Sequence, residues 1–197
     1  MKFIAIASSL LLSGLAAAQD QQSRPFNLVV SSSDTALNGQ KLVSCHSGAA
    51  IQSLCIYGAA GGSEFFFNTT EGAQSPLEGY EAGGSLVWNL NIQPTPASLP
   101  MSFFVNPSSN VALPLFQPSS EYQPVTFSKN GTLAIFSYSD DTQTPPVQEV
   151  TAVRNWYVCQ TSFGGYNYQT LAWVLGKPGS VPQNPSCISV DVTRKFV

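Results

Sequence analysis

Charged side chains are scarce in this chain of 197 residues, of which Asp, Glu, Lys and Arg make up only 10%. An ordinary soluble domain carries about 25% charged residues. The basic residues are scattered singly, apart from Arg194 and Lys195. Nucleic-acid binding requires several cations on one face to neutralise phosphates, so the sequence argues against a nucleic-acid partner. Neutral polar residues must cover the surface instead, which is typical of extracellular β proteins.

Histidine occurs once, at His46, and a Ser-His-Asp or Cys-His enzyme would have to use it. This histidine follows Cys45, and the chain has no G-x-S-x-G nucleophile motif. The glycine-rich stretch 58–62 lacks the Lys-Ser or Lys-Thr of a phosphate-binding loop. Most acidic residues fall in predicted loops or tails, so a paired-carboxylate hydrolase is the least favoured alternative. We therefore expect no catalytic residue, no cofactor and no metal ion.

Long apolar runs are absent except at the start of the chain. Lys2 precedes an apolar stretch over residues 3–15, which leads through three alanines to Ala18 and then to polar residues. These are the parts of a secretory signal peptide, and the run is shorter than the roughly 20 residues of a membrane-spanning helix. We expect cleavage after Ala18, which leaves residues 19–197 as a single secreted domain without a membrane span.

The chain contains four cysteines, Cys45, Cys55, Cys159 and Cys187. An even number in a secreted protein indicates two disulfides. We favour the pairs Cys45–Cys55 and Cys159–Cys187, because each pair flanks neighbouring predicted strands. The alternative is a zinc site that uses three of these cysteines and His46. Adjacent Cys and His residues make poor ligand geometry, and paired C-x-x-C spacing is absent, so we disfavour it.

Two sites for N-linked glycosylation agree with export. Asn68 and Asn130 each begin an Asn-X-Thr sequon. Asn130 is the better candidate, because the Asn-Gly pair that it begins lies between two apolar runs and predicts the exposed tip of a hairpin.

Helical periodicity is missing, and only residues 47–53 could form a helical turn or two. Short runs rich in β-branched and aromatic residues are separated by Gly, Pro, Ser and Asn. They predict twelve strands, at 26–30, 41–45, 54–57, 64–68, 85–90, 101–105, 111–116, 125–128, 133–138, 155–159, 170–175 and 187–192. Such a pattern predicts one all-β domain. The first four strands recur as the next four at an offset of roughly 59 residues, which favours a β-trefoil-like barrel, with a Greek-key β-sandwich as the alternative.

One segment near the C-terminus has the composition of a recognition loop. Residues 161–170 combine aromatic rings, amides and hydroxyls around a pair of glycines, as adaptable binding loops do. Ring faces can stack on the C–H surfaces of sugars, and amides can reach sugar hydroxyls. The candidate ligand-binding residues are Phe163, Tyr166, Asn167, Tyr168 and Gln169. The alternative is a hairpin whose tyrosines cover the core.

The last third of the chain resembles the small secreted, cell-wall-associated proteins of filamentous fungi that include the phialide type. The matching features are the sequence NWYVC at 155–159, the sequence YQTLAW at 168–173, and Cys187 at the start of a final strand. Residues 26–30 and 42–55 are also similar to uncharacterised fungal secreted domains. The resemblance implies an extracellular or wall location and no known catalysis.

These observations predict a non-enzymatic, glycosylated, disulfide-bonded secreted protein that acts at the cell surface or cell wall by binding or by structural presence. The expected partner is a cell-wall polysaccharide or a secreted or surface protein. One alternative is a lectin-like carbohydrate-binding module. The other is an effector or inhibitor that binds a protein partner. Nothing in the sequence specifies an oligomeric state.

Overall fold

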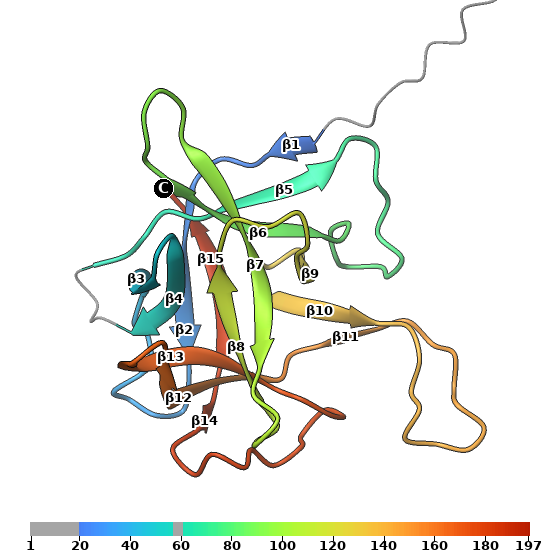
Figure 1. The fold of residues 1–197 in the computed structure, drawn as a ribbon. Coiled ribbons are helices and arrows are strands. Elements are labelled where there is room, and N and C mark those ends of the chain that lie inside the picture. The colour runs from blue at the N-terminus through green and yellow to red at the C-terminus, as the bar shows by residue number, and fades with distance from the viewer. Residues whose placement is uncertain (1–19, 57–60) are drawn as a thin grey trace, which may run out of the picture.

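The computed structural model describes residues 20–56 and 61–197, and the predicted signal peptide, residues 1–18, lies outside this part. All regular secondary structure in the described residues is β, which confirms the predicted fold class (Figure 1). Fifteen strands are present there: β1 (Asp20–Gln22), β2 (Phe26–Ser31), β3 (Leu42–Gly48), β4 (Ile51–Ile56), β5 (Phe66–Thr70), β6 (Gly84–Leu90), β7 (Ala97–Val105), β8 (Val111–Phe116), β9 (Pro124–Phe127), β10 (Leu133–Ser137), β11 (Thr151–Val153), β12 (Trp156–Phe163), β13 (Tyr166–Val174), β14 (Ile188–Ser189) and β15 (Asp191–Phe196). No helix in these ranges is long and apolar enough to cross a membrane.

Each predicted strand overlaps an observed one, but the predicted helical turn at 47–53 is wrong. This segment is the tip of the β3–β4 hairpin, whose ladder runs from Leu42 opposite Ile56 to Gly48 opposite Ile51. The hydroxyls of Ser47 and Ser53 lie 2.7 Å apart across the hairpin and satisfy each other. Pairing along both strands therefore overrides the local preference for a short helix. The structure also adds β1 and β11, which no apolar run predicts.

Six strands form a ring of antiparallel neighbours in the order β2, β5, β6, β9, β10 and β15. Regular ladders join β5 to β6, β6 to β9, β9 to β10, and β15 to β2. Two isolated bridges complete the ring: Phe26 pairs with Phe65 just before β5, and Thr132, just before β10, pairs with Thr193 of β15. The ring therefore returns to its first strand.

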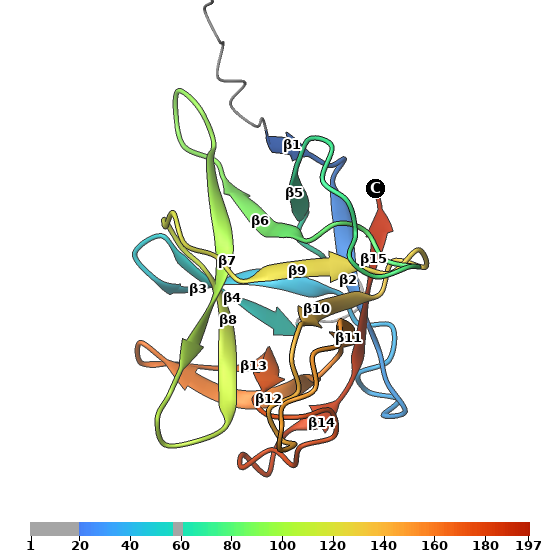
Figure 2. The ribbon, with the colours of Figure 1, turned by 90° about the vertical axis from the view of Figure 1, so that its right-hand side faces the viewer.

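Three hairpins, β3–β4, β7–β8 and β12–β13, pair with one another as well as within themselves. The second strands of the hairpins meet in all three combinations: β4 with β8, β8 with β13, and β13 with β4. Figure 2 shows β7 and β8 on the left of the molecule and the ring strands β2 and β15 on the right. The hairpins thus form a triangular group beside the ring.

The main core lies between the ring and the inner faces of the hairpins. Its largest fully buried side chains include Trp156 and the rings of Phe26, Phe65, Phe116 and Phe127. The indole nitrogen of Trp156 donates a hydrogen bond to the Leu133 carbonyl (3.0 Å), so its one polar group is satisfied.

A second, smaller cluster lies on the outer face of the hairpins. Successive side chains of a strand point to opposite faces. Leu171 and Trp173 of β13 therefore belong to the main core, whereas Ala172 and Val174 pack in the second cluster. The same alternation determines which side chains at the hairpin tips are exposed on the same face.

Arg194 of β15 is a cation enclosed by aromatic rings. Its side chain is only 10% exposed and forms an ion pair with Glu81. The guanidinium carbon lies 4.4 Å from the ring centre of Phe127, 5.0 Å from that of Phe196 and 6.0 Å from that of Phe26. Cation–π contacts stabilise such an arrangement most when the cation is desolvated, so Arg194 fastens the last strand to its neighbours.

Replacing Arg194 with Ala should lower the free energy of unfolding by about 2–3 kcal/mol, because the substitution removes the ring contacts and leaves Glu81 without its partner. Urea denaturation would measure this change. Arg154→Ala is the matched control, because the Arg154–Asp191 pair is nearly half exposed on both sides and should contribute less than about 1 kcal/mol. Equal losses from the two variants would contradict the anchoring role of Arg194.

Candidate functional site

A cleft of about 510 Å³ lies between the segment that joins β10 to β11 and the turn that follows β13. Ligand sites for small molecules commonly have volumes of roughly 300–1,000 Å³. The floor of the cleft is apolar and includes Ile135, Val153 and Trp173. Its rim carries hydroxyl, amide and charged groups, from Ser137, Ser139, Asp140, Asp141, Thr142, Gln143, Glu149, Thr151 and Lys177.

Strand pairing positions the floor. In the β10–β11 ladder, Ile135 lies opposite Val153 and Ser137 lies opposite Thr151, so all four side chains share one face of the pair. Trp173 approaches from β13, and its ring lies 4.7 Å from that of Trp156 and 5.9 Å from that of Phe103. The floor is therefore continuous with the main core and has little freedom to move.

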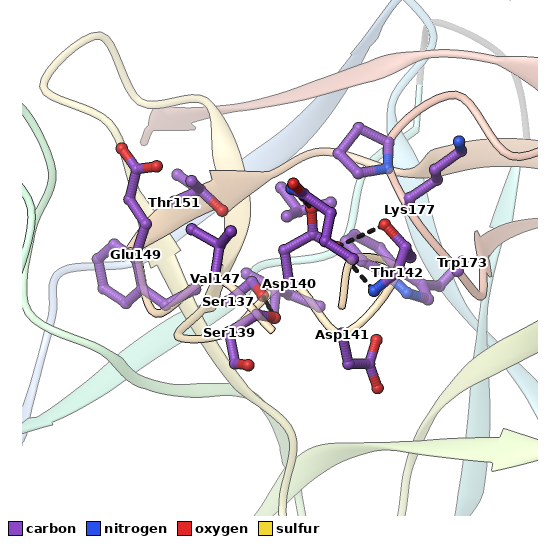
Figure 3. Close-up of a pocket in the computed structure, with 17 residues that line it drawn as sticks. Ser137, Ser139, Asp140, Asp141, Thr142, Val147, Glu149, Thr151, Trp173 and Lys177 are labelled. Carbon is purple, nitrogen blue, oxygen red and sulfur yellow. Dashed lines mark hydrogen bonds between the residues drawn. The ribbon is translucent and has the colours of Figure 1, made fainter. Parts of the chain in front are cut away.

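Hydrogen bonds order the rim segment, although its sequence has no regular spacing of apolar residues. Asp140 and Val147 exchange two backbone hydrogen bonds, of 2.8 and 3.0 Å. The Asp140 carboxylate accepts bonds from the Thr142 amide (3.0 Å), the Thr142 hydroxyl (2.6 Å) and the Gln143 side chain (2.8 Å). Figure 3 shows Asp140 between Glu149 and Thr151 on one side and Trp173 and Lys177 on the other.

The same hydrogen bonds set the charge of Asp140. The Thr142 hydroxyl, followed by Gln143 and the Thr142 amide, lowers the pKa of Asp140 below its ordinary value, and Lys177 adds a smaller effect in the same direction. The carboxylate is thus ionised near neutral pH and acts as a hydrogen-bond acceptor on the rim. Among the described residues, no group of three or more His, Cys, Asp or Glu side chains is placed to hold a metal ion.

The predicted recognition loop is instead a regular hairpin. β12 and β13 pair up to Phe163 opposite Tyr166, and Gly164 and Gly165 form a two-residue turn with φ values of 60° and 85°. Such turns require left-handed backbone at both positions, which glycine adopts without strain. A side chain at Gly164 would also come within 2.8 Å of the Ser47 carbonyl oxygen.

The hairpin divides the five candidate residues between two faces. Phe163, Tyr166 and Tyr168 lie on one face. Asn167 and Gln169 lie on the opposite face. The rings and the amides therefore lie on opposite faces of the hairpin, and the role of these five residues in ligand binding stays a prediction. The tyrosine rings stack on each other with centres 6.0 Å apart, and the Tyr168 hydroxyl donates to the His46 carbonyl (3.0 Å).

Two residues from other strands complete what we call the aromatic patch: His46, Phe104, Phe163, Tyr166 and Tyr168. The His46 ring meets Tyr166 edge-on at 5.3 Å, and Phe104 of β7 meets Phe163 at 5.0 Å. Phe104 is 41% exposed and Tyr166 is 37% exposed. Sequence reasoning missed Phe104 and treated His46 only as a candidate for catalysis or zinc binding, because their neighbours come from distant strands.

A family model for a domain of unknown function, DUF7907, matches residues 23–196. The chain belongs to the DUF7907 family. No curated protein and no solved structure matches the chain. The description of DUF7907 assigns no activity, so the arrangement of the residues is the basis for a functional proposal.

Both disulfides of this DUF7907 protein have the pairing that the sequence favoured, Cys45–Cys55 and Cys159–Cys187. All four cysteines are therefore in disulfides, and none of their thiols is available to bind zinc. Of the two sequon residues, Asn130 is exposed in the turn between β9 and β10, whereas Asn68 is half-buried in β5. Their modification stays a prediction.

The ionised state of Asp140 should stabilise the rim above the ordinary carboxyl pKa of 3.8. This contribution should be lost as the pH falls through the lowered folded-state value, because protonation removes the acceptor of the Thr142 bonds. Hydrogen exchange of residues 139–150 between about pH 5 and pH 2 should show increasing opening. Asp140→Asn should open the segment already at pH 5 and remove most of the acid dependence. Asp141→Asn, at the exposed neighbour, should change neither.

Proposed function

We propose that this DUF7907 protein is secreted and acts without catalysis at the cell surface or wall, by binding a carbohydrate polymer in the cleft between β10–β11 and β13. The observation that carries the proposal is the combination of an apolar floor, which includes Trp173, and a rim of hydroxyl, amide and charged groups. Sugars present a complementary combination, because each ring has apolar C–H faces and a periphery of hydroxyls.

Several features support an extracellular location. The described residues contain two disulfides and no free cysteine, and disulfides persist in oxidising compartments. The low proportion of charged residues and the two sequons agree with this. The resemblance of residues 155–159 and 168–173 to wall-associated proteins of filamentous fungi points to the wall as the place of action.

We also propose that the domain is a β-trefoil. The ring consists of three pairs of strands, β2 with β5, β6 with β9, and β10 with β15, and each pair encloses one hairpin of the triangular group. This is the arrangement of three similar units around an axis. A Greek-key sandwich is less consistent with the pairing, because each of its two sheets would keep edge strands.

The properties of Asp140 suit hydrogen bonding to a ligand and not the general-acid step of hydrolysis. Asp140 accepts three hydrogen bonds within its own segment and has a lowered pKa. A general acid in glycoside hydrolysis needs a raised pKa instead. An ionised carboxylate that is held in place can still accept a hydrogen bond from a sugar hydroxyl, and such charge-assisted bonds are strong.

Sedimentation with insoluble chitin, β-glucan and mannan tests the proposal. The mature protein should sediment saturably with one of these polymers, and soluble fragments of that polymer should compete. Thr151→Arg places a long side chain at an exposed position of the cleft wall and should reduce the bound fraction at least about tenfold, equivalent to 1.4 kcal/mol.

Thr35→Arg is the matched control, because Thr35 is exposed in the turn before β3 and does not line the cleft. It adds the same charge and should leave sedimentation unchanged. Two results would contradict the cleft as a polysaccharide site. One is that the protein sediments with none of the polymers, and the other is that both arginine variants lose the same share of the bound fraction.

The aromatic patch favours a second candidate function, the binding of a secreted or surface protein. The rings of Phe104 and Tyr166 are about 40% exposed. Aromatic residues are enriched at the centres of protein interfaces. The amides of Asn167 and Gln169 lie on the opposite face of the hairpin and do not contribute to the patch.

A Phe104→Ser/Tyr166→Ser double variant should lose a protein partner that is purified from wall extracts with the wild-type chain as bait, because it removes two exposed rings of the patch. Thr151→Arg should retain that partner. Affinity measured by titration with the purified partner would check both results. Binding that survives the double variant and disappears in Thr151→Arg would assign the partner to the cleft instead.

A further inference from the structure

A second hollow, of about 220 Å³, lies on the outer face of the sheet that contains β1, β5, β6 and β7. Figure 1 shows β1, β5 and β6 next to one another in the upper part of the molecule. Asn68 lines this hollow together with a set of hydroxyl-bearing residues, Thr70, Ser85, Ser98, Ser119, Ser120 and Tyr122. The hollow therefore contains a predicted glycosylation site in a lining suited to a sugar.

The carboxamide of Asn68 is held in one orientation. Asn68 lies opposite Gln22 of β1 on one side and opposite Ser85 of β6 on the other. Gln22 donates a hydrogen bond to Asn68 Oδ1 (2.9 Å) and accepts one from Asn89 (3.2 Å). Oδ1 is thus turned toward β1, while Asn68 itself lines the hollow.

Ser85 is a buried polar group that lacks a partner. Its side chain is 93% buried, since the residue is only 7% exposed, and its Oγ makes no hydrogen bond to the described residues. Leaving a buried hydroxyl unpaired costs about 1–3 kcal/mol, so such a group calls for an explanation. A ligand with hydroxyl or amide groups in the hollow would satisfy it.

We propose that Asn68 carries an N-linked glycan whose first N-acetylhexosamine lies in this hollow, bonded to Ser85 Oγ and packed against the ring of Tyr122. Transfer forms a bond between Nδ2 and the anomeric carbon of the sugar. It breaks the bond of that carbon to the diphosphate of a lipid-linked oligosaccharide, which leaves with the amide proton. The inference rests on the secretion part of the proposed function and does not depend on polysaccharide binding.

Asn130 provides an internal comparison. It is exposed at the turn between β9 and β10, and it does not line the hollow. A glycan there should extend into solvent. Tyr122 is 47% exposed, so its ring can be removed with little effect on the core.

The experiment uses the full chain secreted from a eukaryotic host, with site occupancy measured by peptide mass spectrometry. Peptide-N-glycosidase should release the Asn68 glycan from the folded protein about tenfold more slowly than the Asn130 glycan, the effect of roughly one good hydrogen bond. After unfolding, the two sites should be released at the same rate. Tyr122→Ala and Ser85→Ala should each bring the folded-state rate at Asn68 toward that at Asn130, whereas Tyr138→Ala, at an exposed tyrosine outside the hollow, should not.

Equal release rates in the folded wild-type protein, or an unmodified Asn68 beside a modified Asn130, would overturn the inference. A secreted chain in which neither asparagine is modified would overturn the inference as well, whereas a chain that the host fails to export would contradict the proposed secretion. Failure to bind any polysaccharide would leave the result at Asn68 unaffected, so the two proposals fail separately.

Discussion

The closure of the ring by β15 is the constraint on which the rest of the domain depends. β15 pairs over six positions with β2, from Asp191 opposite Ser31 to Phe196 opposite Phe26, and it bridges to Thr132 beside β10. Without it, β2 would present an unpaired edge. The contacts join residues at opposite ends of the described chain, and such non-local pairing makes folding slow. Arg194, enclosed by three phenylalanine rings, strengthens this seam.

The strict alternation of strand faces then determines what the domain can present to a partner. On β13 it sends Trp173 toward the core, where its edge forms part of the cleft floor, and it leaves Tyr166 and Tyr168 on the surface. On β7 it places Phe103 against the tryptophans and Phe104 in solvent beside Phe163. Trp173 and the tyrosines of the aromatic patch thus lie on opposite faces of β13. The cleft is amphipathic, whereas the patch is mostly apolar.

The sequence predicted the strands well where apolar and β-branched residues form uninterrupted runs. Residues 111–116 are the clearest example, since the predicted and observed bounds of β8 coincide. It failed where pairing, not composition, decides the structure: the hairpin tip at Ser47 and Ser53, and the three-residue strands β1 and β11. These segments have no long apolar run of their own and are ordered by a neighbouring strand.

The candidate site was predictable only in part, for a similar reason. Composition identified Phe163, Tyr166 and Tyr168, but strand alternation separates them from Asn167 and Gln169. The cleft was missed because its floor and rim come from segments about 20–40 residues apart, and only folding brings Trp173 beside Ile135 and Val153. No sequence pattern singled out Asp140, whose hydrogen bonds to Thr142 and Gln143 order the rim.

The spacing of the cysteines along the chain has a consequence for how the protein is made. Cys45 and Cys55 are ten positions apart and lie on the two strands of one hairpin, whereas Cys159 and Cys187 are separated by 28 positions near the other end. A growing chain exposes the first pair of thiols more than a hundred residues before the second pair exists. Vectorial synthesis alone therefore favours the native pairing over its two rivals, and the domain has little need of an isomerase to correct crossed bonds.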